Sequence, residues 1–174
     1  MVWKYSLREG EVGAMRPRIL ATGMEFAFPS WLSSLETVFP PPGHELNIAP
    51  ARDDEWMFPA LIELAAQNGY RYKPTGVADG PHFLPINGSV NCHTDSGYGI
   101  IVACLVHDEG SFHANSELVC RYGAMTLGKG DVFAFDSREW HGWISHGFSV
   151  LACISVSPKK SRKSASPPSI VAAS

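Results

Sequence analysis

The second half of the chain is a series of short, largely apolar segments, and this pattern limits the fold more than any other feature. The segments have the length of strands rather than helices, and no 3.6-residue period runs through them. Glycine or polar residues separate them at regular intervals. They span 89–95, 99–107, 111–115, 117–122, 125–127, 131–135, 140–145 and 148–156. Such a series predicts an all-β sandwich or barrel, and we favour a β-sandwich or jelly roll.

Two stretches before these strands have apolar residues at helical spacing. The clearer is 54–68, where apolar residues recur at i, i+4, i+7 and i+8 and Gly69 is placed to end the helix. A shorter helix is expected over about 30–39, before a run of prolines. Each helix has one apolar face to bury. We therefore predict one mainly β domain over 1–156, with these helices packed outside it.

Residues 157–174 are rich in Ser, Pro, Lys and Ala, and we expect them to be a flexible tail, because they cannot bury enough apolar surface to offset the entropy of ordering. Four of the 14 basic residues and none of the 17 acidic residues lie there, so 1–156 carries 10 basic residues and a formal charge of −7. An acidic body argues against a nucleic-acid surface, and only the basic tail is suited to such a contact.

The composition also limits where the chain works. No run approaches the roughly 18 consecutive apolar residues of a membrane span, and the first residues lack the apolar centre of a secretory signal. The four cysteines form no Cys-x-x-Cys pair, and we expect them to be small buried thiols, as in a reducing compartment. These features favour the cytoplasm.

His93 and Asp95 stand two positions apart in the segment 89–95, so a strand would place both side chains on one face. His141 follows 46 residues after Asp95 (141 − 95), behind the apolar segment 131–135. If the intervening strands fold back, the three side chains converge. Two imidazoles and one carboxylate are the set that holds Fe(II) while leaving positions open for oxygen and a substrate. The sequence thus predicts a metal site at these residues.

This order of residues resembles the Fe(II)- and 2-oxoglutarate-dependent dioxygenases. His-x-Asp at 93–95 is followed by about five short strands and then by Gly-Asp-x-x-x-Phe-Asp-Ser-x-x-x-His-Gly at 130–142. The resemblance covers about 84–148. It implies a double-stranded β-helix, which is a relative of the jelly roll, with iron on His93, Asp95 and His141. It also implies that oxidative decarboxylation of 2-oxoglutarate is coupled to hydroxylation or oxidation of a second substrate by O2.

The chain departs from that family at the residue that binds the co-substrate. Many members carry an Arg or Lys about ten residues after the second histidine, paired with the far carboxylate of 2-oxoglutarate, but 149–153 contains no cation. Some members place the cation on a strand between the ligands. Arg121 is therefore the first candidate, and Lys129 or Arg138 the next.

Several residues near the predicted ligands have two readings. His113 suits an alternative ligand or, more simply, a structural histidine. Asn91 and Asp136 suit orienting groups for the ligands or ordinary polar residues at strand ends, and we favour the latter. Trp140 and Trp143 flank His141, and we expect them to pack on the outer face of the strand.

Two other functions compete with the oxygenase. The first is a cupin-like metalloenzyme without 2-oxoglutarate, although cupins usually carry His-x-His where this chain has Asp95. The second is a non-enzymatic jelly-roll binding or structural module with a vestigial triad. No motif names the substrate, which could be a small molecule or a protein side chain, or indicates an oligomeric state.

Overall fold

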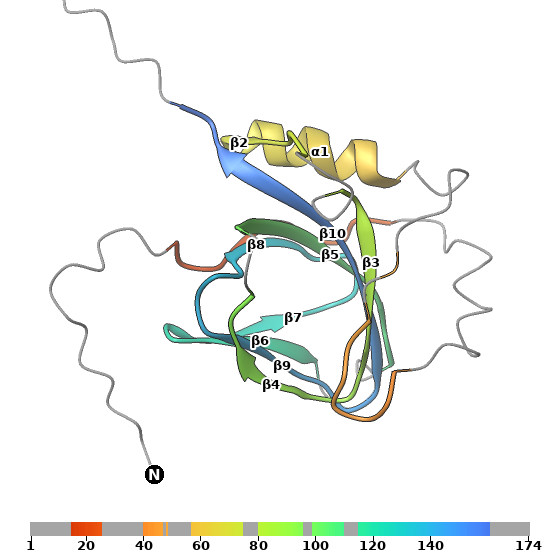
Figure 1. Cartoon of the computed structure of the whole chain (residues 1–174). Helices are drawn as coiled ribbons and strands as arrows, with labels where there is room; N and C mark the ends of the chain where they lie inside the picture. The colour runs from red at the N-terminus through yellow and green to blue at the C-terminus, as the bar shows by residue number, and fades with distance from the viewer. Residues whose placement is uncertain are drawn as a thin grey trace, which may run out of the picture.

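The computed structural model describes residues 15–25, 40–46, 48, 57–74, 80–95, 99–109 and 115–160. In this part of the chain the structure has one helix, α1 (Met57–Gln67), and ten strands (Figure 1). The strands are β1 (Arg18–Ala21), β2 (Tyr70–Arg71), β3 (His82–Asn87), β4 (Val90–His93), β5 (Ile100–Asp108), β6 (Ser116–Cys120), β7 (Gly123–Leu127), β8 (Val132–Asp136), β9 (His141–Ile144) and β10 (Phe148–Pro158).

Strands β3 to β10 form two facing antiparallel sheets. The large sheet has the order β3-β10-β5-β8, and the small sheet has the order β4-β9-β6-β7. The chain therefore passes repeatedly from one sheet to the other, and β3 and β10, the first and last strands of these two sheets, are neighbours. This is the connectivity of a jelly roll. β1 extends the large sheet beyond β8, and β2 pairs with the far end of β10. The predicted double-stranded β-helix core is confirmed.

The large sheet is buried on both faces, and this explains why its central strands are apolar throughout. On β5, Ile100, Val102 and Cys104 belong to the core beneath α1. The alternate residues, Ile101, Ala103 and Leu105, belong to a second core between the two sheets. In Figure 1 the large sheet lies between α1 above and the small sheet below.

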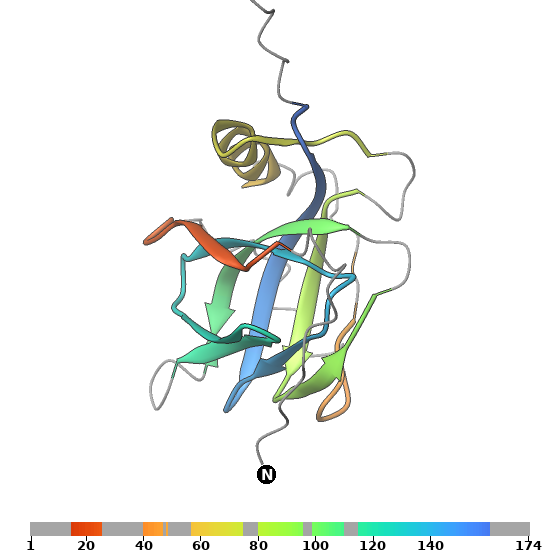
Figure 2. The same cartoon turned by 90° about the vertical axis from the view of Figure 1, so that its left-hand side faces the viewer.

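Helix α1 covers the outer face of the large sheet with one apolar face, formed by Met57, Phe58, Leu61 and Ala65. Figure 2 shows the helix beside β2 and clear of the small sheet. The helix predicted over 54–68 is thus confirmed for 57–67, and Gly69 follows it with φ of 86°. No helix of the described residues is long and apolar enough to cross a membrane.

Some predicted features lie outside the described residues. These are the helix over 30–39, the start of the predicted helix at 54–56, most of the strand predicted over 111–115 with its His113, and the tail from residue 161. The division at 156 stays a prediction, and β10 itself continues to Pro158.

Candidate metal centre

Strands β4 and β9 bring the two predicted histidine ligands together. His93 is the last residue of β4 and His141 the first of β9, and they are register partners with ring centroids 4.6 Å apart. Asp95 follows β4 by two residues, and its carboxylate oxygens lie 3.4 Å from His93 Nε2 and 3.6 Å from His141 Nε2. One ligand atom from each of the three residues lies within 4.8 Å of the others. The predicted convergence is confirmed.

A β-bulge in β4 directs His93 toward the space between the sheets. Val90 pairs with Trp143 and His93 with His141, so three steps along β4 oppose two along β9. In a regular strand Val90 and His93 would point to opposite faces. The bulge shifts the alternation by one residue, and both line the same cavity.

The residues inside the bulge, Asn91 and Cys92, are exposed. Our expectation of buried cysteines is therefore wrong for Cys92 and holds for Cys104 and Cys153, while Cys120 is half-buried. Gly142 lies against this bulge. A Cβ at Gly142 would lie 2.9 Å from Cys92 Sγ and 3.0 Å from the Cys92 nitrogen and the Val90 oxygen. Close approach of β4 and β9 between the two histidines thus depends on glycine at 142.

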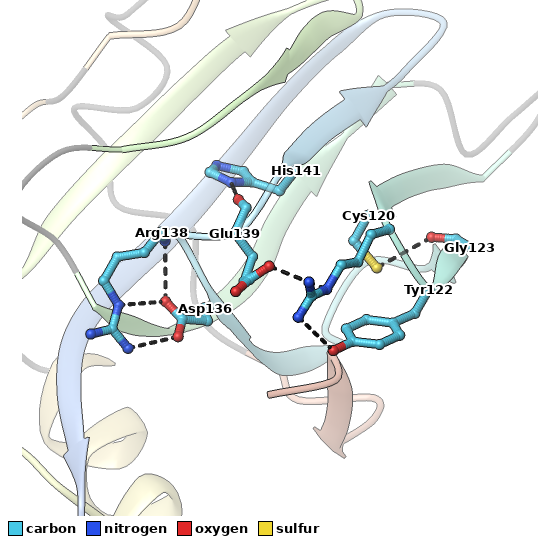
Figure 3. A network of polar contacts seen from close by, with 8 residues as sticks. Cys120, Tyr122, Gly123, Asp136, Arg138, Glu139 and His141 are labelled. Atoms are coloured by element: carbon cyan, nitrogen blue, oxygen red, sulfur yellow. Dashed lines mark hydrogen bonds and ion pairs between the residues drawn. The ribbon is translucent and has the colours of Figure 1, made fainter. Parts of the chain in front are cut away.

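Backbone carbonyls fix the orientation of both imidazoles. His93 Nδ1 lies 2.8 Å from the Asn91 carbonyl oxygen, and His141 Nδ1 lies 2.9 Å from that of Glu139, the latter drawn in Figure 3. A carbonyl oxygen can only accept, so each Nδ1 carries the proton and donates. Each Nε2 then presents a lone pair toward the Asp95 carboxylate. Acceptors that face one another at this distance are held together by a proton or by a metal ion, and the donor set suits a metal ion.

His141 is the more buried of the two histidines, with a side chain 10% exposed against 33% for His93. Burial lowers the pKa of His141 below its ordinary value, while the Glu139 carbonyl and the Asp95 carboxylate oppose this shift. The ring of Phe135 packs 5.1 Å from that of His141. The imidazole is therefore neutral near pH 7, and this is the form that binds metal.

Hydrogen bonds join the segment after β4 to the turn between β8 and β9. The Asp95 N–H donates to the Ser137 carbonyl over 2.9 Å, and both the N–H and the hydroxyl of Ser137 donate to the Gly99 carbonyl over 3.0 Å. The two chain segments that carry the triad are thus bound to each other through their backbones.

Asp136, the last residue of β8, pairs with Arg138 of this turn in a bidentate contact of 2.9 and 2.7 Å (Figure 3). Hydrogen bonds from Arg138 hold the pKa of the Asp136 carboxyl below its ordinary value. Arg138, one of the three candidate cations for 2-oxoglutarate, is therefore already paired with a carboxylate two positions away in the sequence.

The triad faces a cavity of about 80 Å³ between the sheets. Its inner wall is apolar and includes Ile86, Ile101, Leu118, Phe135 and Leu151. Two polar residues that sequence reasoning missed as site residues, Glu45 and His82, also line it. Glu45 Oε1 lies 3.7 Å from His93 Nε2, and burial raises the pKa of the Glu45 carboxyl. No local pattern marks Glu45, because it reaches the site through an isolated bridge to Ile86.

Trp143 also lines the cavity, and the expectation that it packs on the outer face is wrong. It stands two positions after His141, and period-two alternation places both on the inner face. Trp140 does lie outside, with 57% of its surface exposed.

Arg121, the first candidate for binding 2-oxoglutarate, lies in a different network. Its Nε is 3.2 Å from Glu139 Oε2, and its Nη2 donates to the Tyr122 hydroxyl over 3.1 Å. Figure 3 shows Tyr122 and Glu139 at the two ends of this network. Neither Arg121, Arg138 nor Lys129 lines the cavity, and its described lining contains no Lys or Arg.

Comparisons with known proteins found little. No protein-family model matches the chain, and no curated protein matches it. A solved structure of a cupin-2 domain containing protein from Shewanella frigidimarina NCIMB 400 is similar with a TM-score of 0.39 and 11% identity, over 74% of this chain and 92% of that chain. So distant a likeness establishes no family, and the jelly-roll assignment follows from the strand order.

Proposed function

We propose that this protein is a non-haem Fe(II) oxygenase that uses O2 to oxidise a small substrate. The observation that carries the proposal is the convergence of His93 Nε2, His141 Nε2 and the Asp95 carboxylate at the edge of a cavity. Two histidines and one carboxylate with further positions open are the ligand set of non-haem Fe(II) oxygenases.

The chain's own residues would hold, orient and shield the ion. The Asn91 and Glu139 carbonyls keep both Nδ1 atoms protonated, so both Nε2 atoms are free to bind. The apolar inner wall would exclude water from the reacting part of the substrate. When bound, Fe(II) would supply the activation of O2.

The resemblance of the sequence implies that 2-oxoglutarate is the co-substrate, and this is the finer version of the proposal. Its far carboxylate would need a charge-assisted partner. Arg121 would have to leave Glu139 to serve, since the described lining holds no cation.

A second version, a cupin-like metalloenzyme that works without 2-oxoglutarate, is favoured by one observation. Glu45 places an acidic group beside His93 at the cavity, and a carboxylate there would repel a dicarboxylate. The two versions share the metal site and differ only in the co-substrate.

An anaerobic titration tests the proposal. Chelator-treated protein is titrated first with Fe(II) and then with 2-oxoglutarate, while the weak metal-to-ligand charge-transfer absorption is recorded. We expect Fe(II) to bind the wild type and an exposed-histidine control, His146→Ala, but not His93→Ala. Absence of specific Fe(II) binding would refute the oxygenase and leave a jelly-roll binding module.

The same samples show whether 2-oxoglutarate is the co-substrate. A charge-transfer band with succinate formation in air supports the 2-oxoglutarate version. Iron binding without band or succinate supports the second version.

A further inference from the structure

The cavity has its polar groups at the mouth and its apolar groups inside. The side chains of Glu45 and Asp95 are 34% and 31% exposed, whereas Leu118 and Leu151 are 3% and 4% exposed. A bound molecule would therefore keep its polar end at the mouth and insert its hydrocarbon part between the sheets.

The polar side chains at the mouth are acceptors once the triad holds a metal. Glu45 is a carboxylate whose Oε1 lies 3.7 Å from His93 Nε2. His82 Nδ1 lies 3.1 Å from the Gly80 carbonyl, to which it can only donate, so His82 Nε2 is left as an acceptor. The triad's own atoms would be occupied by the ion.

The remaining polar side chains of the lining add no accessible hydrogen-bond donor at the mouth. The Trp143 indole is a donor, but its Nε1 is buried within the wall and has no exposed surface. The Cys153 thiol is 2% exposed and is only a weak donor. With no Lys or Arg in the described lining, the mouth offers a carboxylate and an imidazole lone pair to whatever enters.

We propose that the cavity takes a small aliphatic amine, with its ammonium group at Glu45 and its hydrocarbon chain against the apolar inner wall. The inference deepens the proposed function and rests on it, because it names the substrate class of the same site. An ammonium group supplies both donors and a positive charge to the Glu45 carboxylate. A cavity of about 80 Å³ is about half of one that holds benzene, so a chain of about four carbons is suitable.

The test is a calorimetric titration with butylamine and with 1-butanol, which has the same shape without the charge. Butyrate is the third probe. Each is measured with metal-free and anaerobic Fe(II)-loaded protein, so binding is separated from turnover. We expect butylamine to bind about tenfold more tightly than 1-butanol, and butyrate to bind more weakly than butylamine.

Glu45→Gln is the decisive variant, because it keeps the shape and removes the charge. We expect it to bring the two affinities within about twofold. Fe(II) affinity is measured separately in the same variant, because the Glu45 carboxylate lies 3.7 Å from His93 Nε2. Glu63→Gln, on the exposed face of α1, is the matched control and should keep the preference.

Two results would overturn the inference: tighter binding of butyrate in the wild type, or an amine preference that survives Glu45→Gln. If that variant kept the preference and lost Fe(II), Glu45 would be a metal ligand. The wild-type comparison decides the matter alone if the variant does not fold. Preference for butylamine without Fe(II) binding would refute the oxygenase and support the amine site. Fe(II) binding without that preference would support the metal site and refute the amine site.

Discussion

His93 and His141 face each other across the β4–β9 pair as register partners, with Asp95 oxygens 3.4 and 3.6 Å from their Nε2 atoms. When both imidazoles are neutral and no metal is bound, the lone pairs of these atoms and the carboxylate repel one another. An ion at this point should therefore stabilise the fold as well as complete the site.

The first prediction concerns this coupling. A divalent ion at 100 times its Kd should raise the free energy of unfolding of the wild type by about 2.7 kcal/mol. His141→Ala should lose nearly all of this gain, because two ligands hold an ion far less well than three. Urea unfolding with and without Fe(II) or Zn(II) measures this gain in both proteins, with His146→Ala as the control. Equal stabilisation of wild type and His141→Ala would place the ion elsewhere.

The second prediction concerns Gly142. Alanine there would place a Cβ 2.9 Å from Cys92 Sγ and 3.0 Å from backbone atoms of β4, so β4 must move away from β9. We expect Gly142→Ala to lower the free energy of unfolding by about 1–3 kcal/mol and metal affinity by at least about tenfold.

Gly99→Ala is its matched control, since a Cβ at Gly99 meets nothing within 4 Å. Chemical denaturation and metal titration of both variants provide the comparison. A Gly142→Ala protein with wild-type metal affinity would show that strand separation does not set the triad geometry.

The sequence alone predicts the three metal ligands but not the bulge that directs His93 into the cavity. The spacing of two predicts that the side chains of His93 and Asp95 share one face, and the apolar strand before His141 indicates the third ligand. The bulge at 91–92 could not be foreseen, because it is defined by the partner strand β9 and not by any residue type in β4. The wrong prediction for Trp143 has another cause. Its spacing of two from His141 already predicts that both side chains lie on the same face.

Glu45 shows a further limit. It joins the site through a bridge to Ile86, across 41 positions of the chain (86 − 45), and no periodicity surrounds it. The helix α1, by contrast, was predicted because four apolar residues at helical spacing are a local property. Local periodicity therefore predicts the strands, the helix and the His93–Asp95 pair. The bulge and the position of Glu45 depend on pairing between distant parts of the chain.

The third prediction concerns acid. Burial lowers the pKa of His82 in the folded protein below its ordinary value of 6.5. As the pH falls through 6.5, the unfolded chain binds this proton before the folded protein does, so stability is full above that pH and is lost below it.

We expect metal-free wild type to be less stable at pH 5.5 than at 7.5, and His82→Gln to lose less between the two. Urea unfolding at both pH values gives the difference. If His82→Gln lost as much stability as the wild type, the histidine would not be a source of the acid sensitivity.

The last prediction concerns Arg121. Its guanidinium is 3.2 Å from Glu139 Oε2 and is bonded to the Tyr122 hydroxyl. Glu139 also supplies the carbonyl that orients His141. Arg121→Met keeps most of the apolar volume and removes the charge, so we expect a stability loss of about 0.5–1 kcal/mol and an Fe(II) affinity within about threefold of the wild type. Thermal unfolding measures the stability loss, and Fe(II) titration measures the affinity.

The same variant also tests the co-substrate. If Arg121→Met abolished a 2-oxoglutarate charge-transfer band that the wild type shows, Arg121 would leave Glu139 to bind the co-substrate. The 2-oxoglutarate version of the proposed function would then be supported.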